Sequence, residues 1–239
     1  MSALVISRSI QSSPSGLGAT VFARADGTPM RRHAMGRRRP GGQYRSRKNG
    51  FALRWTSRAE LSAFYRAEVD ADITGYRAHP HRLEFVRHGQ QHSYVPHLEL
   101  KHASGLVEIL EVVPRIPFEG LGRYIAKLRG AAEAYEALGL RFRVVDRSVV
   151  EAEPQFSAAQ TIQSYRHTVV STRDMMLIDR LRQLGEIQSL GSVKAAFANP
   201  ALAMAKAFAM AVRRIIEIDL TDGLHDGALV RILSEDRHD

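Results

Sequence analysis

Apolar positions along the chain change their spacing several times, and each change marks an expected element. Helical spacing begins after Thr56 or Ser57, and Glu60 stands three residues beyond Ser57 in a capping-box pattern. Apolar side chains then recur at intervals of three and four residues as far as Val69. This pattern predicts a helix that ends before Gly75.

Three β-prone runs follow this helix. Residues 82–86 alternate between polar and apolar and stop at residues 87–90, which predicts a hairpin turn. Residues 92–100 form the expected second strand, in which Pro96 requires an edge or irregular position because it lacks an N–H. The nearly continuous apolar run of residues 106–113 predicts a central strand that is covered on both faces.

Helical spacing returns over residues 119–138, and Gly139 is the expected C-cap. Residues 140–145 then alternate as a further strand. A helix, antiparallel strands, a central strand, a helix and a last strand form an α/β layer pattern of about one hundred residues. The fold class expected for this region is therefore α/β, with a mixed sheet flanked by helices.

The pattern becomes mostly helical after Pro154. Helices are expected over residues 161–168, 172–184, 192–198 and 201–214, a strand over 215–220, a turn over 221–227 and a second strand over 228–233. Three helices and a hairpin are the parts of a winged helix, an architecture that binds DNA in some proteins and docks proteins in others. The last helix is rich in Ala and Met, so base-specific reading by it is not expected.

Composition limits the chemistry. With 44% hydrophobic and 25% charged residues the chain is typical of a soluble globular protein, and no stretch suggests a signal peptide or a membrane span. Without cysteine, disulfides, thiol catalysis and cysteine-ligated zinc are excluded. We expect a cytoplasmic protein that does not bind membranes, and the sequence leaves its oligomeric state open.

The net charge of +9 is concentrated at the start of the chain. Residues 1–50 hold ten Lys or Arg and one acid, Asp26, whereas the remaining residues are formally neutral. This Gly-, Ser- and Arg-rich segment is expected to be a disordered arm that contacts DNA phosphates, or else a solvated tail that aids solubility. Its candidate DNA contacts are Arg37, Arg38, Arg39, Arg45, Arg47 and Lys48.

Three short motifs in a fixed order carry a family resemblance. Residues 57–61 (SRAEL), 94–97 (YVPH) and 109–114 (ILEVVP) resemble the amino-terminal domain of TnsA, the endonuclease subunit of heteromeric transposases. The resemblance implies a restriction-endonuclease-like PD-(D/E)xK fold over residues 51–153, followed by a helical, winged-helix-like domain over residues 154–239. It also implies DNA and a transposase or other mobile-element protein as partners.

The family's chemistry requires carboxylates that hold Mg²⁺ or Mn²⁺ near the scissile phosphate, with a lysine beside them. By resemblance, Glu60 matches the helix carboxylate and Glu111 the acid of the central strand. His97 stands where the family has Asp, and Val113 stands where it has Lys. Glu60, His97 and Glu111 are thus the candidate catalytic and metal-binding residues, and Glu60 is alternatively only the capping-box acid.

The two replacements leave three functional hypotheses. The favoured one is a DNA-binding, TnsA-like subunit whose cleavage is impaired or lost. The second is an active endonuclease, rescued by Glu99, by Lys127 or Arg123, or by manganese or zinc at the His97 site. The third is a regulatory module that binds a protein. The remaining histidines lack a metal-ligand spacing and are expected to be scattered on the surface.

Overall fold

The computed structural model describes residues 3–10, 18–30, 40–113 and 122–233, and the chain divides into two compact units. The first unit comprises residues 1–43, 53–60 and 75–148, and the second comprises residues 44–52, 61–74 and 149–239. The two units alternate along the chain, whereas the sequence suggested three consecutive segments.

Residues 44–52 and 61–74 belong to the second unit, and long-range hydrogen bonds connect them to its C-terminal part. The hydroxyl of Tyr44 donates a hydrogen bond to Gln163 Oε1 at 3.2 Å. The guanidinium of the buried Arg214 donates from Nε to the carbonyl of Ala71 at 2.9 Å. Both pairs join residues more than one hundred positions apart, and sequence periodicity carries no information on such pairings.

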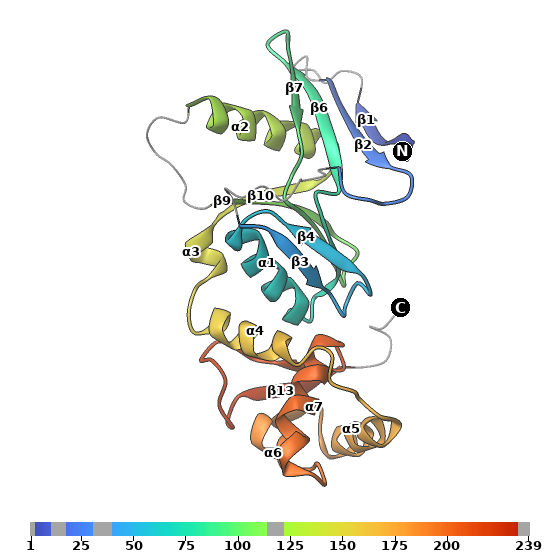
Figure 1. The fold of residues 1–239 in the computed structure, drawn as a ribbon, viewed down its shortest axis with the longest axis vertical. Coiled ribbons are helices and arrows are strands. Elements are labelled where there is room, and N and C mark those ends of the chain that lie inside the picture. Colours follow the sequence, from blue (N-terminus) through green and yellow to red (C-terminus); the bar gives the residue numbers. More distant parts are fainter. Residues whose placement is uncertain (1–2, 11–17, 31–39, 114–121, 234–239) are drawn as a thin grey trace. The chain divides into compact units, whose positions relative to one another are not determined.

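An antiparallel sheet in the first unit pairs two strands from the start of the chain with two strands from residues 81–94 (Figure 1). Its strand order is β1-β2-β6-β7, with β1 at Leu4–Ile10, β2 at Gly18–Arg24, β6 at His81–Arg87 and β7 at Gln90–Tyr94. The turn between β6 and β7 places His88 and Gly89 at positive φ, which closes the predicted hairpin.

The expectation of a disordered arm over residues 1–50 is wrong for the described part of that segment. Strands β1 and β2 pair with each other, and β2 pairs with β6 so that Val21 lies opposite Leu83. Ala19 and Val21 are buried in the core of the unit. The short apolar run of β2 is surrounded by Gly, Ser and Arg, so its strand was not predicted; its pairing partner β6 is distant in the sequence. Arg37, Arg38 and Arg39 lie outside the described residues.

A second sheet in this unit has the order β10-β9-β8-β5. Its strands are β5 (Ile73–Ala78), β8 (Leu98–His102), β9 (Val107–Val113) and β10 (Arg141–Asp146). Strand β9 runs antiparallel to β8 and parallel to β10. Six of its seven residues are buried, which confirms the predicted central strand.

The single strand expected over residues 92–100 is instead two strands. β7 ends at Tyr94 and β8 begins at Leu98, and the two belong to different sheets. Pro96 lies in the break and has no N–H for a ladder, so the chain changes sheet there. The break leaves His97 directly before β8.

Helix α2 (Gly122–Ala137) supplies the helical face of the first core. Its Ala131, Ala134 and Tyr135 are fully buried and belong to one cluster with Leu83 and Phe85 of β6. The helix ends before Gly139, whose φ of 69° confirms it as the left-handed cap. The first part of the helix expected over residues 119–138 lies outside the described residues.

The predicted capping-box helix is α1 (Arg58–Val69), and it follows a short hairpin. The hairpin strands are β3 (Gly42–Arg45) and β4 (Ala52–Trp55). The amide of Ser46 donates to the carbonyl of Phe51 at 3.2 Å, which holds the connection between the two strands.

The C-terminal part of the chain contains short helices and a three-stranded sheet of order β11-β13-β12. The helices are α3 (Arg147–Val150), α4 (Gln155–Ser164), α5 (Thr172–Leu184), α6 (Leu190–Ala195) and α7 (Pro200–Val212). The strands are β11 (Ile187–Ser189), β12 (Ile216–Ile218) and β13 (Leu229–Ile232). The helix expected over residues 161–168 begins earlier, at Gln155, and ends at Ser164.

The second unit has its own core. Ile162 of α4, Ile178 of α5 and Phe208 of α7 pack in one cluster with the buried face of the β12–β13 pair. Helix α5 begins with a capping box, in which the Ser171 side chain accepts from the Asp174 amide and the Asp174 side chain accepts from the Ser171 amide. Among the helices that the structure describes, none is long and apolar enough to cross a membrane.

Candidate functional site

Glu60 lies in the first turn of α1, buried in the first unit. Its carboxylate accepts hydrogen bonds from the amide of Thr56 at 2.8 Å and from the hydroxyl of Thr56 at 2.6 Å, while its own amide donates to Ser57 Oγ. The capping role expected from the sequence is therefore present. The same carboxylate also faces two histidines, so capping is only part of its environment.

His97 lies between the two candidate carboxylates. Its Nε2 is 3.3 Å from Glu60 Oε1, and its Nδ1 is 3.4 Å from Glu111 Oε2. The amide of Val112 donates to Nδ1 at 3.2 Å. A backbone N–H can only donate, so the proton of the neutral ring belongs on Nε2, facing Glu60. The structure thus brings together all three residues chosen from the sequence.

Glu111 lies on β9 with both carboxylate oxygens engaged. Tyr94 donates to Oε2 at 2.6 Å, and Tyr124 of α2 donates to Oε1 at 2.7 Å. Burial raises the pKa of Tyr94 well above its ordinary value, and the charge of Glu111 raises it further. Tyr94 therefore keeps its proton and remains a donor.

His79 is the residue of this cluster that sequence reasoning missed. It is buried, with Nε2 3.8 Å from Glu60 Oε1 and its ring edge-on to His97 at 6.0 Å. Its backbone adopts a φ of 48°, and its amide donates to the carbonyl of His97 at 2.9 Å. This contact joins segments eighteen positions apart, so histidine spacing alone gave no sign of it.

The surroundings of Glu60 favour its ionised form. Burial alone raises the pKa of this carboxyl, but the neighbouring imidazoles of His79 and His97 and the Thr56 hydroxyl outweigh burial and lower the pKa to about 2. Since the side chain is only 1% exposed, water contributes little to this balance. The cluster thus holds a buried carboxylate with protein donors.

Glu99 has a partner outside the candidate cluster, and Lys127 faces the ring of Tyr94. Glu99 Oε2 lies 3.6 Å from Nδ1 of the buried His81, whose Nε2 contacts the Tyr135 hydroxyl at 2.8 Å. Lys127 Nζ lies 5.9 Å from the centre of the Tyr94 ring, a distance suited to a cation–π contact. Neither contact supplies a further carboxylate or a cation to Glu111.

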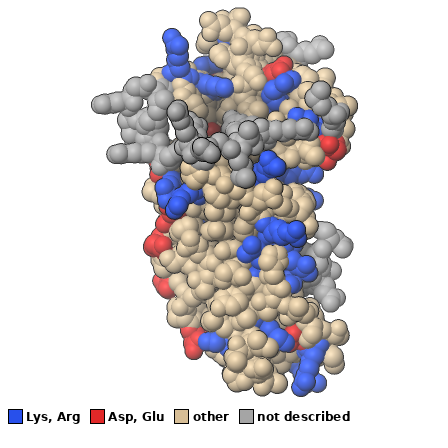
Figure 2. Space-filling model, viewed as in Figure 1, with Lys and Arg blue, Asp and Glu red and all other residues tan. Residues whose placement is uncertain are grey.

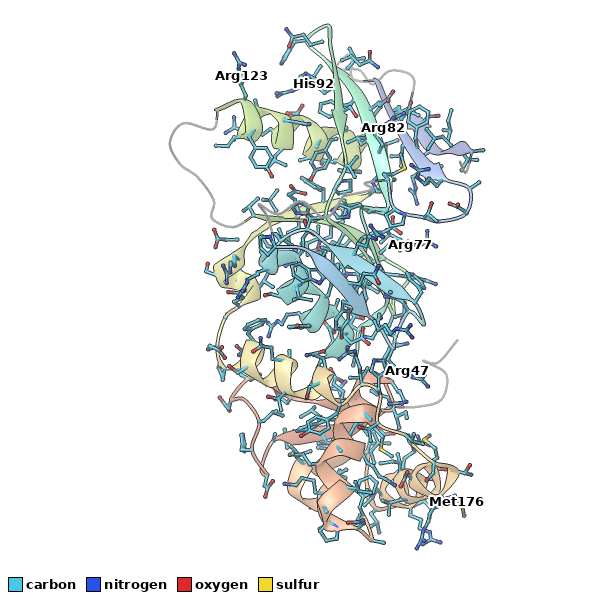
Figure 3. All side chains as sticks on the ribbon, in the orientation of Figure 1. Arg47, Arg77, Arg82, His92, Arg123 and Met176 are labelled. Carbon is cyan, nitrogen blue, oxygen red and sulfur yellow. The ribbon has the colours of Figure 1, made fainter. Side chains whose placement is uncertain are left out.

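The other two positions of interest do not supply a cation beside Glu111 either. Arg123, at the start of α2, projects outward from the helix in Figure 3. Val113 follows Glu111 on the same face of β9 and is buried. Its side chain has neither a charge nor a hydrogen-bonding group.

The donor set of this cluster does not fit the Mg²⁺ or Mn²⁺ ion that the resemblance implies. Among the described residues, no group of three or more His, Asp or Glu side chains is arranged so that it can hold a metal ion. The oxygens of Glu111 and Glu60 already accept hydrogens from Tyr and Thr hydroxyls. Mg²⁺ requires oxygen lone pairs directed at the ion, so these hydrogen bonds compete with it.

The candidate DNA contacts that the structure describes differ in their availability. Arg45 and Arg47 have exposed side chains. Lys48 instead donates to the carbonyls of Ala67 and Asp70, at the end of α1. Burial lowers the pKa of Lys48 to about 7, although the charge of Glu68 opposes this effect. Lys48 therefore caps a helix and is not directed at solvent.

Six side chains define the candidate site, from α1, the ends of β5, β7 and β8, strand β9 and helix α2. They are Glu60, His79, Tyr94, His97, Glu111 and Tyr124. All of them belong to the first unit. Their arrangement is a closed network in which each carboxylate is held by hydroxyl or imidazole groups. The sequence matches no protein-family model and no curated protein.

Proposed function

We propose that this chain is a DNA-binding protein with a restriction-endonuclease-like, TnsA-like core that no longer cleaves DNA. It would act as a subunit of a mobile-element complex, with a transposase or a related protein as its partner. The resemblance of the three sequence motifs motivates this proposal, and three features of the molecule support it.

The order of elements supports the core fold. Helix α1 is followed by β5, by strands β6 and β7 of the other sheet, by β8 and β9, and then by α2 and β10; the sheet order is β10-β9-β8-β5. The nuclease fold requires a helix carboxylate and acids on adjacent strands, and here α1 carries Glu60, β9 carries Glu111 and His97 precedes the adjacent β8. His97 lies 37 positions from Glu60 and 14 from Glu111 in the sequence, and its side chain contacts both carboxylates, as such a site requires.

The observation that carries the proposal is the position of His97. It contacts Glu60 through one ring nitrogen and Glu111 through the other, and so its imidazole fills the space between the two carboxylates that the family chemistry needs for its metal. Val113 removes the lysine that the family chemistry needs on the same strand face. Phosphoryl transfer depends on such charged groups, so their loss should abolish efficient cleavage while the fold persists.

The C-terminal unit supports a partner-binding role. Its element order α5, β11, α6, α7, β12, β13 and its strand order β11-β13-β12 agree with the proposed winged-helix-like domain. Helix α7 takes the place of a recognition helix, yet its exposed large side chains are the apolar Leu202 and Met204. Apolar groups do not read base edges by hydrogen bonding, so this helix is better suited to docking a protein.

A plasmid assay tests the proposal. Supercoiled DNA is incubated with the native protein and with Glu111→Ala, in magnesium and then in manganese, with and without a partner transposase. We expect retarded but intact plasmid with the native protein under every condition. Nicking by the native protein that disappears in Glu111→Ala would show an active endonuclease with a rearranged site. Glu136→Ala, an exposed acid on α2, is the matched control.

A further inference from the structure

Four arginines and one histidine, from three segments of the second unit, gather into what we call the basic platform. Its members are Arg45, Arg47, Arg166, His167 and Arg213. Figure 2 shows a patch of Lys and Arg atoms on the displayed face, at the level where Figure 3 labels Arg47. Only Arg45 and Arg47 were chosen from the sequence, since the other members lie more than one hundred positions further along the chain.

Hydrogen bonds to backbone carbonyls hold two of the platform's arginines in place. Arg166 Nε donates to the carbonyl of Arg45 at 2.8 Å, which joins the β3 hairpin to the end of α4. Arg213 Nη2 donates to the carbonyl of Thr168 at 2.8 Å, and its Nη1 donates to Ala209 at 2.7 Å. The Arg166 guanidinium also lies over the Tyr44 ring, 4.6 Å from its centre. Two arginines are therefore held in place before any ligand arrives.

The platform has little negative charge to offset it. Within the described ranges, none of its four arginines forms an ion pair with a carboxylate. The neighbouring acid, Glu68, is buried and accepts from the Ser46 hydroxyl and the Arg47 amide. Burial lowers the pKa of His167, the charges of Arg166 and Arg47 lower it further, and Glu68 opposes them. Among these causes, the contributions of Arg166 and Arg47 show that positive charge lies close to this imidazole.

We propose that the basic platform binds the backbone phosphates of duplex DNA. Guanidinium groups form paired hydrogen bonds to phosphate oxygens and stay charged at every physiological pH. Arg45 and Arg47 supply exposed heads, while Arg166 and Arg213 supply fixed positive charge beneath them. The contact is sequence-independent because it involves no base edge. This inference rests on the proposed DNA-binding function and assigns that function to a structured surface of the second unit.

Fluorescence anisotropy with two labelled duplexes of unrelated sequence tests the platform over a salt series. Each lost phosphate contact should weaken binding on the order of tenfold near 0.1 M salt and lower the slope of log K against log salt by about 0.9. Arg45→Ala/Arg47→Ala should therefore lose about two units of slope on both duplexes. Arg47→Glu, which also removes two units of positive charge, should lose a comparable share of the affinity.

The matched control is Arg180→Glu, which reverses one exposed arginine on α5 of the same unit. We expect it to retain most of the native affinity. Equal affinities of Arg47→Glu and Arg180→Glu would overturn the platform while leaving DNA binding intact. Absence of binding by the native protein at low salt would overturn the proposed function itself. Because Arg45 and Arg47 are exposed, the variants should keep the native circular dichroism spectrum, and a loss of DNA affinity with that spectrum retained supports the platform.

Discussion

Replacing Glu60 by Gln tests the electrostatics of the buried cluster. The substitution keeps the size of the side chain and one oxygen that can accept from Thr56, but it removes the negative charge that faces His79 and His97. The pKa of Glu60 is lowered from its ordinary value of 4.5 to about 2. At about 1.4 kcal/mol per pH unit, the ionised form contributes about 3 kcal/mol to folding at pH 7.

The sign of this contribution fixes its pH dependence. The folded-state pKa is depressed, so the stabilisation is fully present above pH 4.5 and is lost as pH falls toward 2. The difference in unfolding free energy between native protein and Glu60→Gln should thus be about 3 kcal/mol at pH 7. It should shrink to about 1 kcal/mol at pH 3, where the carboxyl is protonated in the unfolded chain but still ionised in the folded one.

Urea unfolding followed by tryptophan fluorescence measures this difference. Trp55 is the one tryptophan in the sequence and stands directly before Thr56, so its emission reports on the segment that holds Glu60. Glu136→Gln, on the exposed side of α2, is the control and should change stability by less than about 0.5 kcal/mol. A Glu60→Gln effect below about 1 kcal/mol at pH 7, or one that does not change down to pH 3, would show that the charge of Glu60 does not stabilise the folded protein.

Three further predictions concern packing, capping and catalysis. Gly130→Ala should cost about 1–3 kcal/mol, because its Cβ would lie 2.6 Å from the buried Phe85 ring; Gly122→Ala, with open space around it, is the control, and equal urea midpoints would contradict this. Lys48→Met removes two hydrogen bonds to backbone carbonyls and should lower the free energy of unfolding by about 1–2 kcal/mol. It should leave the salt dependence of DNA binding unchanged, and a shallower salt dependence at native stability would contradict this. His97→Asp/Val113→Lys should gain magnesium-dependent plasmid nicking, since it restores the family's missing groups; nicking that persists without magnesium would contradict a metal site.

Local sequence signals predicted the elements whose stability is largely local. The capping box at Ser57 and Glu60 marked the start of α1, and Gly139 marked the end of α2. The apolar run of β9 was recognised as central because nearly every position is buried. In each case the period or the cap lies within one continuous segment, so no distant residue is needed to read it.

Strands stabilised by distant partners were harder to recognise. In the sequence, strand β2 looks like part of a Gly- and Arg-rich tail. It is stabilised by backbone pairing with β6, which lies about sixty positions later. β11 has only three residues and depends on β13 for its pairing. Propensity over such short segments is weak, and pairing across the chain decides their structure.

The candidate site shows the same division. Glu60, His97 and Glu111 were identified through their order in the sequence, and the structure brings them together. His79 was assigned to the surface because no ligand spacing marked it, yet the bond between its amide and the His97 carbonyl draws it into the cluster. Arg166 was passed over for the same reason, since its contact with the β3 hairpin crosses 121 positions.

We propose a protein that has a nuclease-like core and binds DNA without cutting it. The most direct test reads binding and cleavage from one sample: a labelled duplex is titrated with native protein in magnesium or manganese, its anisotropy is recorded, and the same DNA is then resolved on a denaturing gel. We predict salt-sensitive binding that either metal weakens only as other added salt does, with both strands intact. Cut strands that appear with the native protein and vanish with Glu111→Ala would contradict the claim.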